Sequence, residues 1–397
     1  MLQEHFANLS SLLLIPILLY SVRTLYFLVG ILYSIAKSNS KQNTYLNKKI
    51  QFSEKKLTLA SIIVPARDEE QNIAACIRSI FEADIKDIQL ELIIIDDRSS
   101  DNTSSIVEEI FQEAPDSINC ILHQIKSDSE KQLLGKPGAV QIGIEISKGE
   151  AILMTDADCT INPGWIKAHL IQHQTSKTKL SFSGSFTLIK GDTVFGRLQE
   201  VEWMFSHTMA SAAATLHLPL GCYGNNISAS RKLLIETNGF KNIPFSVTED
   251  LALMQAADSK NATITYPCSV SSSVTTQPVT TLKEYIDQRQ RWAVGGRALG
   301  WKAIAFVIST ASITLSLIAL TIFGQFALAA ALLAFRVLCD TIIILPSAIK
   351  LKRHRLLPWV PFSLLALIIT ESIIPFLLLR KKVVWKGQTF FRNESKK

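Results

Sequence analysis

The sequence predicts an α/β domain that membrane-spanning helices hold at a bilayer, and two observations predict this fold class. Long apolar segments lie near both ends of the 397-residue chain, whose 48% of hydrophobic residues is high for a wholly water-soluble protein. Between about Leu57 and Trp292, no apolar run is long enough to cross a bilayer, and short strand-like segments alternate with longer helix-like ones. We therefore expect a water-exposed α/β domain flanked by membrane anchors.

Each apolar segment is long enough to cross a hydrocarbon core of about 30 Å, which requires about 20 helical residues. One segment, SLLLIPILLYSVRTLYFLVGILYSI, lies near the N-terminus, and about three follow the α/β domain. A cleaved signal peptide is the alternative for the first, but this segment lacks preceding basic residues and a small-residue cleavage site. The expected organisation is an N-terminal membrane anchor (1–36), a basic linker (37–56), the α/β domain (57–300), a C-terminal membrane region (301–380) and a basic tail (381–397).

Lysines close to the first apolar segment predict which side of the membrane the domain faces. By the positive-inside rule they place it in the cytoplasm, as part of a multi-pass protein of the cytoplasmic membrane. The same rule places two later basic clusters, KLKRHR at 350–355 and RKK at 380–382, in the cytoplasm. A single membrane span between them would instead put them on opposite sides of the membrane. Either the last apolar segment is re-entrant or interfacial, or one cluster breaks the rule. The lysines after the first segment are Lys37, Lys41, Lys48, Lys49, Lys55 and Lys56.

The formal net charge of +7 comes mostly from these clusters beside the membrane. We therefore interpret it as attraction to anionic lipid headgroups and not as nucleic-acid binding. The six cysteines are widely scattered without a CxxC pair, which fits a reduced compartment. The N-glycosylation sequons at Asn102, Asn226 and Asn261 would then be unmodified.

Three strand-like runs near the start of the domain are each followed by polar residues. The first ends at Pro65, the second runs into Asp96 and Asp97, and the third, AILM, is followed by Asp156 and Asp158. Because the apolar runs are continuous and alternate with helical patterns, they predict a parallel sheet covered on both faces. Ligands of such sheets bind at the carboxyl ends of the strands, so these aspartates should face one crevice.

Asp156 and Asp158 repel each other unless a cation or a proton lies between them. Turn chemistry alone would not require two acids at alternate positions. Mg²⁺ or Mn²⁺, which prefers oxygen ligands, would settle the repulsion and would in turn hold a diphosphate. For Asp96 and Asp97 the alternative is local capping of the next helix.

Two further motifs lie nearer the C-terminal membrane region. The first is TED at 248–250, at the start of an apolar helical pattern, where helix capping is the alternative. The second is QRQRW, in which Gln288, Arg291 and Trp292 share a helix face at spacings of three and four. An ordinary membrane-interface belt is its alternative interpretation.

Together, VPARDEE, IIDDRSSDNT, GK at 135–136, DAD, TED and QRQRW occur in the order and approximate spacing of membrane-bound family 2 glycosyltransferases. The sequence resembles that family, which includes ceramide glucosyltransferases and the cellulose, chitin and hyaluronan synthases. The resemblance covers about Leu57 to Gly296 and the flanking spans. It implies the GT-A fold, a nucleotide-binding α/β domain with a mixed central sheet.

The resemblance also implies a role for each matching residue. Asp97, with Asp96 beside it, would contact the uracil of a UDP-sugar, and Asp250 would be the general base. Asp156 and Asp158 would bind the donor's ribose and diphosphate through Mg²⁺ or Mn²⁺. The implied donor-binding residues are Pro65, Asp96, Asp97, Lys136, Asp156 and Asp158. The implied residues for the leaving group and acceptor are Glu249, Gln288, Arg291 and Trp292.

This assignment is chemically coherent. An acceptor hydroxyl must lose its proton as the new C–O bond forms, and the carboxylate of Asp250 can take it. The leaving diphosphate gains negative charge, which a metal on Asp158 together with Arg291 would offset. The resemblance implies inversion at the anomeric carbon, so that an α-linked donor gives a β-glycoside.

We expect a metal-dependent, inverting glycosyltransferase that moves a hexosyl unit from a UDP-sugar to a membrane-presented acceptor. The expected acceptor is a lipid and not a growing polysaccharide. The small membrane region, and GCYGNNISASRKLL at 221–234 in place of the more aromatic segment of cellulose synthases, disfavour a polysaccharide channel. The alternatives are a short processive β-glycan synthase, which QxxRW favours, and a non-enzymatic membrane scaffold, which the intact motifs disfavour. Arg336 and Asp340 inside a span should pair within the protein, with a role in acceptor passage as the alternative.

Overall fold

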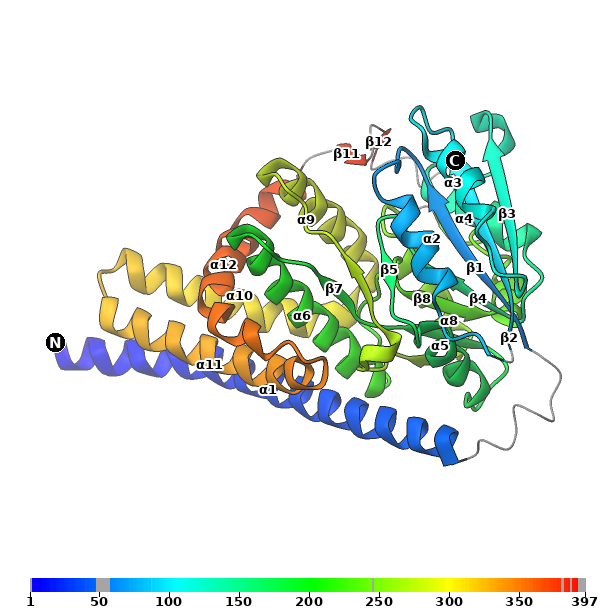
Figure 1. The fold of residues 1–397 in the computed structure, drawn as a ribbon. Helices are drawn as coiled ribbons and strands as arrows, with labels where there is room; N and C mark the ends of the chain where they lie inside the picture. Colours follow the sequence, from blue (N-terminus) through cyan, green and yellow to red (C-terminus); the bar gives the residue numbers. More distant parts are fainter. Residues whose placement is uncertain are drawn as a thin grey trace.

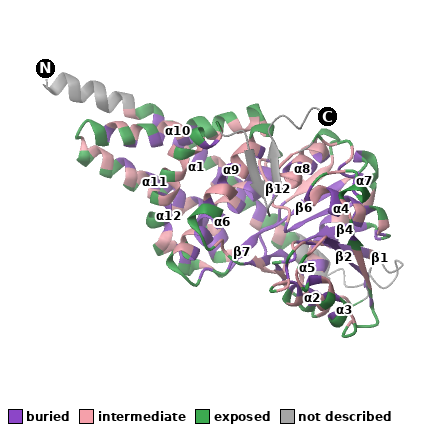
Figure 2. Ribbon diagram, turned by 90° about the horizontal axis from the view of Figure 1, so that it is seen from above, coloured by how far each residue is buried: buried purple, intermediate pink, exposed green. Residues whose placement is uncertain are grey.

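The computed structural model describes residues 2–47, 58–86, 88–244, 246–379, 382–385 and 388–391. It has an α/β domain at one end and a group of long helices at the other (Figure 1). Buried residues concentrate in the strands of the α/β domain, whereas the long helices expose much of their surface (Figure 2). Lys48, Lys49, Lys55, Lys56 and most of the expected basic tail lie outside the described residues.

A seven-stranded sheet with the strand order β3-β2-β1-β4-β8-β6-β9 forms the centre of the α/β domain. The first four strands in this order pair in parallel, whereas β8 runs antiparallel to both of its neighbours, β4 and β6. The sheet is mixed, which confirms the expected fold class: the predicted parallel pairing holds for β1 to β4, and β6 and β9 also pair in parallel, whereas both pairs that involve β8 are antiparallel. Its strands are β1 (Thr58–Ala66), β2 (Ile88–Asp97), β3 (Ile118–Ile125), β4 (Ala151–Met154), β6 (Ser181–Gly184), β8 (Ile227–Ser230) and β9 (Thr263–Thr265).

Helices cover both faces of this sheet, and the strands are therefore buried on both sides. Successive side chains of a strand point to opposite faces. Ile63 of β1 accordingly packs in one core cluster with Ile144 of α4, and Ile62 packs in another with Ile77 of α2. The helices around the sheet are α2 (Ile73–Phe81), α3 (Thr103–Phe111), α4 (Lys136–Ile146), α5 (Trp165–Gln174), α7 (Arg231–Thr237) and α8 (Glu249–Ser259).

Strand β3 was not expected from the sequence. Its residues, INCILHQI, mix polar and apolar side chains, and most of them are partly exposed. Because β3 lies at the edge of the sheet, it needs less apolar surface than a central strand, and its sequence signal is correspondingly weak. A smaller sheet with the order β5-β10-β7 contains β5 (Thr160–Ile161), β10 (Val274–Thr276) and β7 (Thr187–Ile189).

Four helical segments are long and apolar enough to cross a membrane, in agreement with the apolar segments of the sequence. They are Leu13–Ser40, Trp301–Ile322, Phe326–Lys350 and His354–Leu377. The corresponding elements are α1 (Leu2–Asn47), α10 (Trp301–Ile322), α11 (Phe326–Lys350), the 3₁₀ turn η4 (His354–Trp359) and α12 (Val360–Leu377). Two other helices, α6 (Val194–Thr215) and α9 (Leu282–Gly296), lie between the sheet and these segments, and a hairpin of β11 (Lys382–Trp385) and β12 (Gln388–Phe391) follows them (Figure 1).

Polar side chains inside the helical segments pair within the protein, as expected for Arg336 and Asp340. Arg336 lies with its Nε 3.8 Å from Asp340 Oδ2, and its Nη2 makes a closer ion pair of 2.7 Å with Glu371 Oε1 of α12. Asp340 also accepts hydrogen bonds from Tyr20 at 2.8 Å and Arg23 at 3.5 Å, both on α1. The pairs join α1, α11 and α12.

Helix α6 joins the sheet to the long apolar helices, and it packs against α1, α11 and α12. Gly30 of α1 allows the closest approach, since a Cβ atom there would lie 2.7 Å from the carbonyl oxygen of Ala212. One turn further on, the hydroxyl groups of Ser34 and Ser211 lie 2.8 Å apart. The contact therefore depends on the absence of a side chain at Gly30.

The substitution Gly30→Val should separate α1 from α6 and lower the stability of the protein. Overpacking of this kind costs about 1 to 3 kcal/mol. We expect a lower midpoint of thermal unfolding in detergent, measured by intrinsic fluorescence. The matched control is Val29→Leu, because Val29 is half exposed on the same helix and should leave the midpoint unchanged. Equal midpoints for the two variants would show that the helices can move apart freely.

Candidate active site

A cleft of about 240 Å³ opens at the carboxyl ends of the parallel strands. Pro65 lies at the end of β1, Asp97 ends β2, and Asp156 and Asp158 follow β4; all four line the cleft. The adjacency of β1 to both β2 and β4 brings these positions together. The predicted residues that line this cleft are Pro65, Asp97, Lys136, Asp156, Asp158, Glu249, Asp250, Gln288, Arg291 and Trp292.

Asp96 is not among the lining residues. One carboxylate oxygen accepts a hydrogen bond of 2.9 Å from the backbone N–H of Ser99, and the other accepts a short hydrogen bond from Ser104. These contacts organise the loop after β2 and the first turn of α3. Among the described residues of α3, no backbone N–H donates to Asp96, so this side chain holds the loop before the helix and does not cap the helix itself.

Asp97 faces the cleft as part of a buried charge cluster. Lys131 Nζ donates to both carboxylate oxygens of Asp97, at 2.9 and 2.7 Å, and Arg98 Nε donates at 3.0 Å. The side chain of Lys131 is 1% exposed, so its ammonium group pairs with Asp97 and has almost no contact with solvent. Lys131 lies outside the sequence motifs, and no local pattern points to its role beside Asp97.

Lys136, at the start of α4, is the cation between the carboxylates of the cleft. Its Nζ lies 2.5 Å from Asp156 Oδ1 and 3.5 Å from Glu249 Oε1. Burial alone would lower the pKa of Lys136, but the charges of Asp156 and Glu249 raise it above its ordinary value. Lys136 therefore stays protonated at neutral pH and holds the loop after β4 close to the start of α8.

Asp156 and Asp158 provide the oxygen donors that a divalent cation would need. Asp158 Oδ1 accepts a hydrogen bond of 3.3 Å from the thiol of Cys159, and Asp156 contacts Lys136. In the part of the chain that the structure describes, no group of three or more acidic, histidine or cysteine side chains could hold a metal ion. The protein's donor set thus fits a cation that takes its remaining ligands from water or from a substrate diphosphate, as Mg²⁺ commonly does.

Asp250 lines the cleft at the start of α8. Its carboxylate accepts hydrogen bonds from the backbone N–H of Gly224 at 2.6 Å and of Leu251 at 2.8 Å. Burial, with the neighbouring charge of Glu249, raises the pKa of Asp250 to about 7. A carboxyl group with this pKa is partly ionised at neutral pH, which suits a general base.

Helix α9 carries the QRQRW motif to the cleft. A capping box starts the helix, in which the side chain of Thr281 accepts from the backbone of Glu284 and the Glu284 carboxylate accepts from the backbone of Thr281. The helical spacing brings Gln288, Arg291 and Trp292 to the cleft. Trp292 packs inside the protein, so the membrane-belt interpretation does not describe its position.

Two family models match the chain. The model described as "Glycosyl transferase family 2" matches residues 61–236. The model described as "Glycosyl transferase family group 2" matches residues 151–377, which is more than half of the chain. The protein is a member of this glycosyltransferase family. The membership confirms the resemblance drawn from the motifs and supports an enzyme over the non-enzymatic scaffold.

Curated relatives of this glycosyltransferase include enzymes with different named products. It is 24% identical over 254 residues to the probable glycosyltransferase YdaM of Bacillus subtilis, which is 63% of this chain and 58% of the relative. It is 35% identical over 127 residues to a dolichyl-phosphate β-glucosyltransferase of Dictyostelium discoideum, which is 30% of this chain and 37% of that relative. It is 23% identical over 275 residues to a poly-β-1,6-N-acetyl-D-glucosamine synthase of Staphylococcus aureus, which is 69% of this chain and 62% of that relative. The chain thus spans less than two thirds of the length of each.

Among solved structures, the mannosyltransferase PcManGT of Pyrobaculum calidifontis superposes with a TM-score of 0.53. The superposition covers 82% of this chain and 99% of that protein, at 14% sequence identity. The likeness confirms that this glycosyltransferase has the GT-A fold with a mixed central sheet.

Glu202 of α6 is a residue of the glycosyltransferase that the sequence reasoning missed. It is buried, and its Oε2 accepts hydrogen bonds from Tyr285 at 2.9 Å and from Arg289 Nη2 at 2.5 Å. The guanidinium of Arg289 lies 4.3 Å from the ring centre of Trp292. Arg289, inside QRQRW, thus points away from the cleft and fixes α9 and Trp292 from behind. The sequence signal was only an acid in a mostly apolar helix.

An aromatic wall also escaped the sequence analysis. The rings of Trp203 and Tyr223 lie 5.3 Å apart, and each lies within 5.5 Å of Trp292. All three residues line the cleft beside Asp250. Tyr223 belongs to GCYGNN, whose Asn226 is fully buried and accepts a hydrogen bond of 2.8 Å from Trp165.

Removal of Glu202 should destabilise this glycosyltransferase strongly, because Arg289 would remain buried without its ion-pair partner. Breaking one side of a buried pair costs about 3 to 5 kcal/mol. We expect Glu202→Met to lower the thermal midpoint in detergent, and the double variant Glu202→Met/Arg289→Met to recover part of the loss.

The control is Glu113→Ala, which breaks the exposed ion pair of 3.0 Å between Arg78 and Glu113. Exposed pairs contribute little, so its midpoint should stay close to that of the unsubstituted protein. A double variant as unstable as the sum of the two single variants would contradict the coupling between Glu202 and Arg289.

Proposed function

We propose that this glycosyltransferase transfers a hexosyl unit from a UDP-sugar to a hydroxyl group of a membrane-presented acceptor, with inversion and with a divalent cation. The observation that carries the proposal is the convergence of Lys136, Asp156, Asp250 and Arg291 on one cleft. A proton acceptor and two cations are what glycosyl transfer from a diphosphate requires.

In the proposed reaction, the acceptor oxygen bonds to the anomeric carbon while the bond from that carbon to the UDP diphosphate breaks. The acceptor's proton passes to the carboxylate of Asp250, and the electron pair of the broken bond leaves with the diphosphate. Lys136 and Arg291 offset the negative charge that develops there. Mg²⁺ or Mn²⁺ held by Asp156, Asp158 and the diphosphate would supply further positive charge.

The cleft residues and a structural relative support a nucleotide-sugar donor. Asp97, at the end of β2, is in the position that the family motif assigns to recognition of uracil, and Lys131 and Arg98 hold it in place. The PcManGT mannosyltransferase was solved with GDP-Man and Mn²⁺, which supports a nucleotide diphosphate sugar together with a divalent cation.

A lipid is the acceptor that we favour. The helix that carries QRQRW packs directly against α12, whose outer side exposes large apolar residues. The name of the dolichyl-phosphate β-glucosyltransferase supports an acceptor of this class. The second candidate is a β-glycan synthase, because the wall of Trp203, Tyr223 and Trp292 offers faces on which a sugar ring can stack. The poly-β-1,6-N-acetyl-D-glucosamine synthase favours this alternative.

The test is to incubate membranes that contain the protein with radiolabelled UDP-glucose and Mg²⁺ or Mn²⁺, and then to partition the products. Membranes with Asp250→Asn serve as the blank. Label in the organic phase above the blank would support a glycolipid product and provide it for mass spectrometry. Label in insoluble or high-molecular-weight aqueous material would overturn the lipid preference and support the glycan synthase. If glucose gives no product, other nucleotide sugars follow.

The activity should fall as the pH drops through about 7, because Asp250 has its pKa raised to about 7 and must be ionised to accept a proton. We expect kcat/KM to decrease about tenfold for each pH unit below this value. The measurement is a profile of kcat/KM against pH for the active donor.

The matched variant for this profile is Glu249→Gln, which removes the like charge next to Asp250. Without that charge the pKa of Asp250 should fall, and the acid limb of the profile should move to lower pH. An acid limb at the same pH in both proteins would assign it to another group.

A further inference from the structure

Helix α12 lies between two basic clusters that both predict a cytoplasmic position. The first follows α11 and includes Lys352, which is exposed, and Arg353, which forms an ion pair of 2.8 Å with Glu200 of α6. The second is RKK at 380–382, directly after α12. A helix that crossed the bilayer would put one cluster on the far side.

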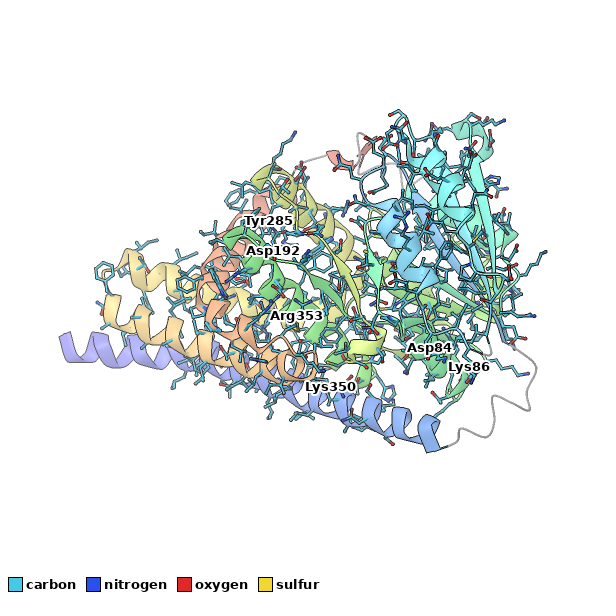
Figure 3. All side chains as sticks on the ribbon, viewed as in Figure 1. Asp84, Lys86, Asp192, Tyr285, Lys350 and Arg353 are labelled. Carbon is cyan, nitrogen blue, oxygen red and sulfur yellow. The ribbon has the colours of Figure 1, made fainter. Side chains whose placement is uncertain are left out.

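The direction of α12 differs from that of the other three apolar helices. Helices α1, α10 and α11 lie alongside one another and point away from the α/β domain, whereas α12 runs across them (Figure 1). If α1, α10 and α11 cross the bilayer, a helix in the direction of α12 lies along its surface. Figure 3 labels Arg353, which precedes the turn η4 that leads into α12, and Tyr285 of α9, which contacts Thr370 in the C-terminal half of α12.

The contacts of α12 tie it to the helices beside the cleft. The hydroxyl of Ser363 donates a hydrogen bond of 3.1 Å to the carbonyl oxygen of Leu198 in α6. The hydroxyl groups of Thr370 and of Tyr285 in α9 lie 3.4 Å apart. Glu371 holds Arg336 of α11 at 2.7 Å. One side of α12 therefore carries the polar residues and is covered by protein.

The other side of α12 is an apolar stripe at spacings of three and four residues, as one face of a helix requires. Its exposed fractions range from 39% to 70%, so protein in the described part of the chain leaves it largely uncovered. Trp359, a residue type enriched at membrane interfaces, precedes the stripe. The stripe consists of Phe362, Leu365, Ile369, Ile373 and Phe376.

The chain after α12 returns to the α/β domain. Strand β11 lies against α9, the helix that carries QRQRW. A crossing of the hydrocarbon core would separate the two ends of α12 by about 30 Å along the bilayer normal. Contact of β11 with α9 instead keeps both ends of α12 on the side of the α/β domain.

We propose that α12 is a membrane-surface helix that lies in the cytoplasmic leaflet with its apolar stripe on the acyl chains. The basic clusters at its two ends bind anionic headgroups, and α1, α10 and α11 are the helices that cross. Both clusters then obey the positive-inside rule, and α12 holds α9 at the level of the leaflet surface. The proposal requires no particular donor or acceptor, so it stands or falls separately from the proposed function.

The side of the membrane that each segment faces can be tested with a membrane-impermeant maleimide on sealed vesicles of known orientation. Single cysteines replace Lys352 before α12, Thr389 after it and Phe323 between α10 and α11, and the unsubstituted chain is the labelling blank. We expect Lys352→Cys and Thr389→Cys to react from the same side, and Phe323→Cys from the opposite side. Reaction of Thr389→Cys together with Phe323→Cys would show that α12 crosses and would overturn the proposal.

The contact with lipid can be measured by spin labels on the stripe, in the full chain reconstituted into vesicles of phosphatidylcholine and phosphatidylglycerol. Nitroxides at Phe362→Cys, Ile369→Cys and Phe376→Cys are compared for relaxation by oxygen and by a water-soluble nickel complex. A surface helix gives three similar, shallow depths. A depth that changes steadily along the helix would indicate a crossing, and poor access to both reagents would indicate a protein cover; either result would overturn the proposal.

Discussion

The ion pair between Glu202 of α6 and Arg289 of α9 fixes the cleft relative to the membrane helices. Both side chains are removed from water, so each charge depends on the other for compensation. Helix α6 packs at the same time against α1, α11 and α12, while α9 supplies one wall of the cleft. The pair therefore connects α9, which carries QRQRW, to the helices that pack against α6. The guanidinium of Arg289 lies over the ring of Trp292, and this contact extends the connection to the aromatic wall.

The cleft brings several charged side chains close together, and this arrangement lowers the local stability of the protein. Asp250 and Glu249 are adjacent acids next to the buried Lys136, and the burial of Asp250 disfavours its ionised form. A protein selected for stability alone would avoid such a set of buried like charges. The backbone hydrogen bonds from Gly224 and Leu251 hold Asp250 in place despite this cost, and a bound donor and its cation would complete the balance of charges.

The sequence predicted the strands that have a local pattern of apolar residues. It did not predict contacts between residues that are far apart in the chain. Continuous apolar runs identified β1, β2 and β4, and Asp97, Asp156 and Asp158 do share one cleft, whereas the predicted Asp96 does not line it. The antiparallel pairing of β8 depends on partners distant in the chain, which no local pattern encodes. Lys131 reaches Asp97 across 34 positions and Arg289 reaches Glu202 across 87, so neither pair leaves a short motif.

Helix α1 continues without a break for 46 residues, from the part beside α10 and α11 to the part that rests on α6. At 1.5 Å per residue it is a rod of about 69 Å, longer than a bilayer is thick. If the N-terminal part of this rod crosses a bilayer while its C-terminal part rests on α6, a tilt of the rod also tilts the cleft. Transmembrane helices tilt to match the thickness of their bilayer. In that arrangement, bilayer thickness would set the distance of the cleft from the headgroups, and therefore the distance that the acceptor of the proposed reaction must cover to reach Asp250.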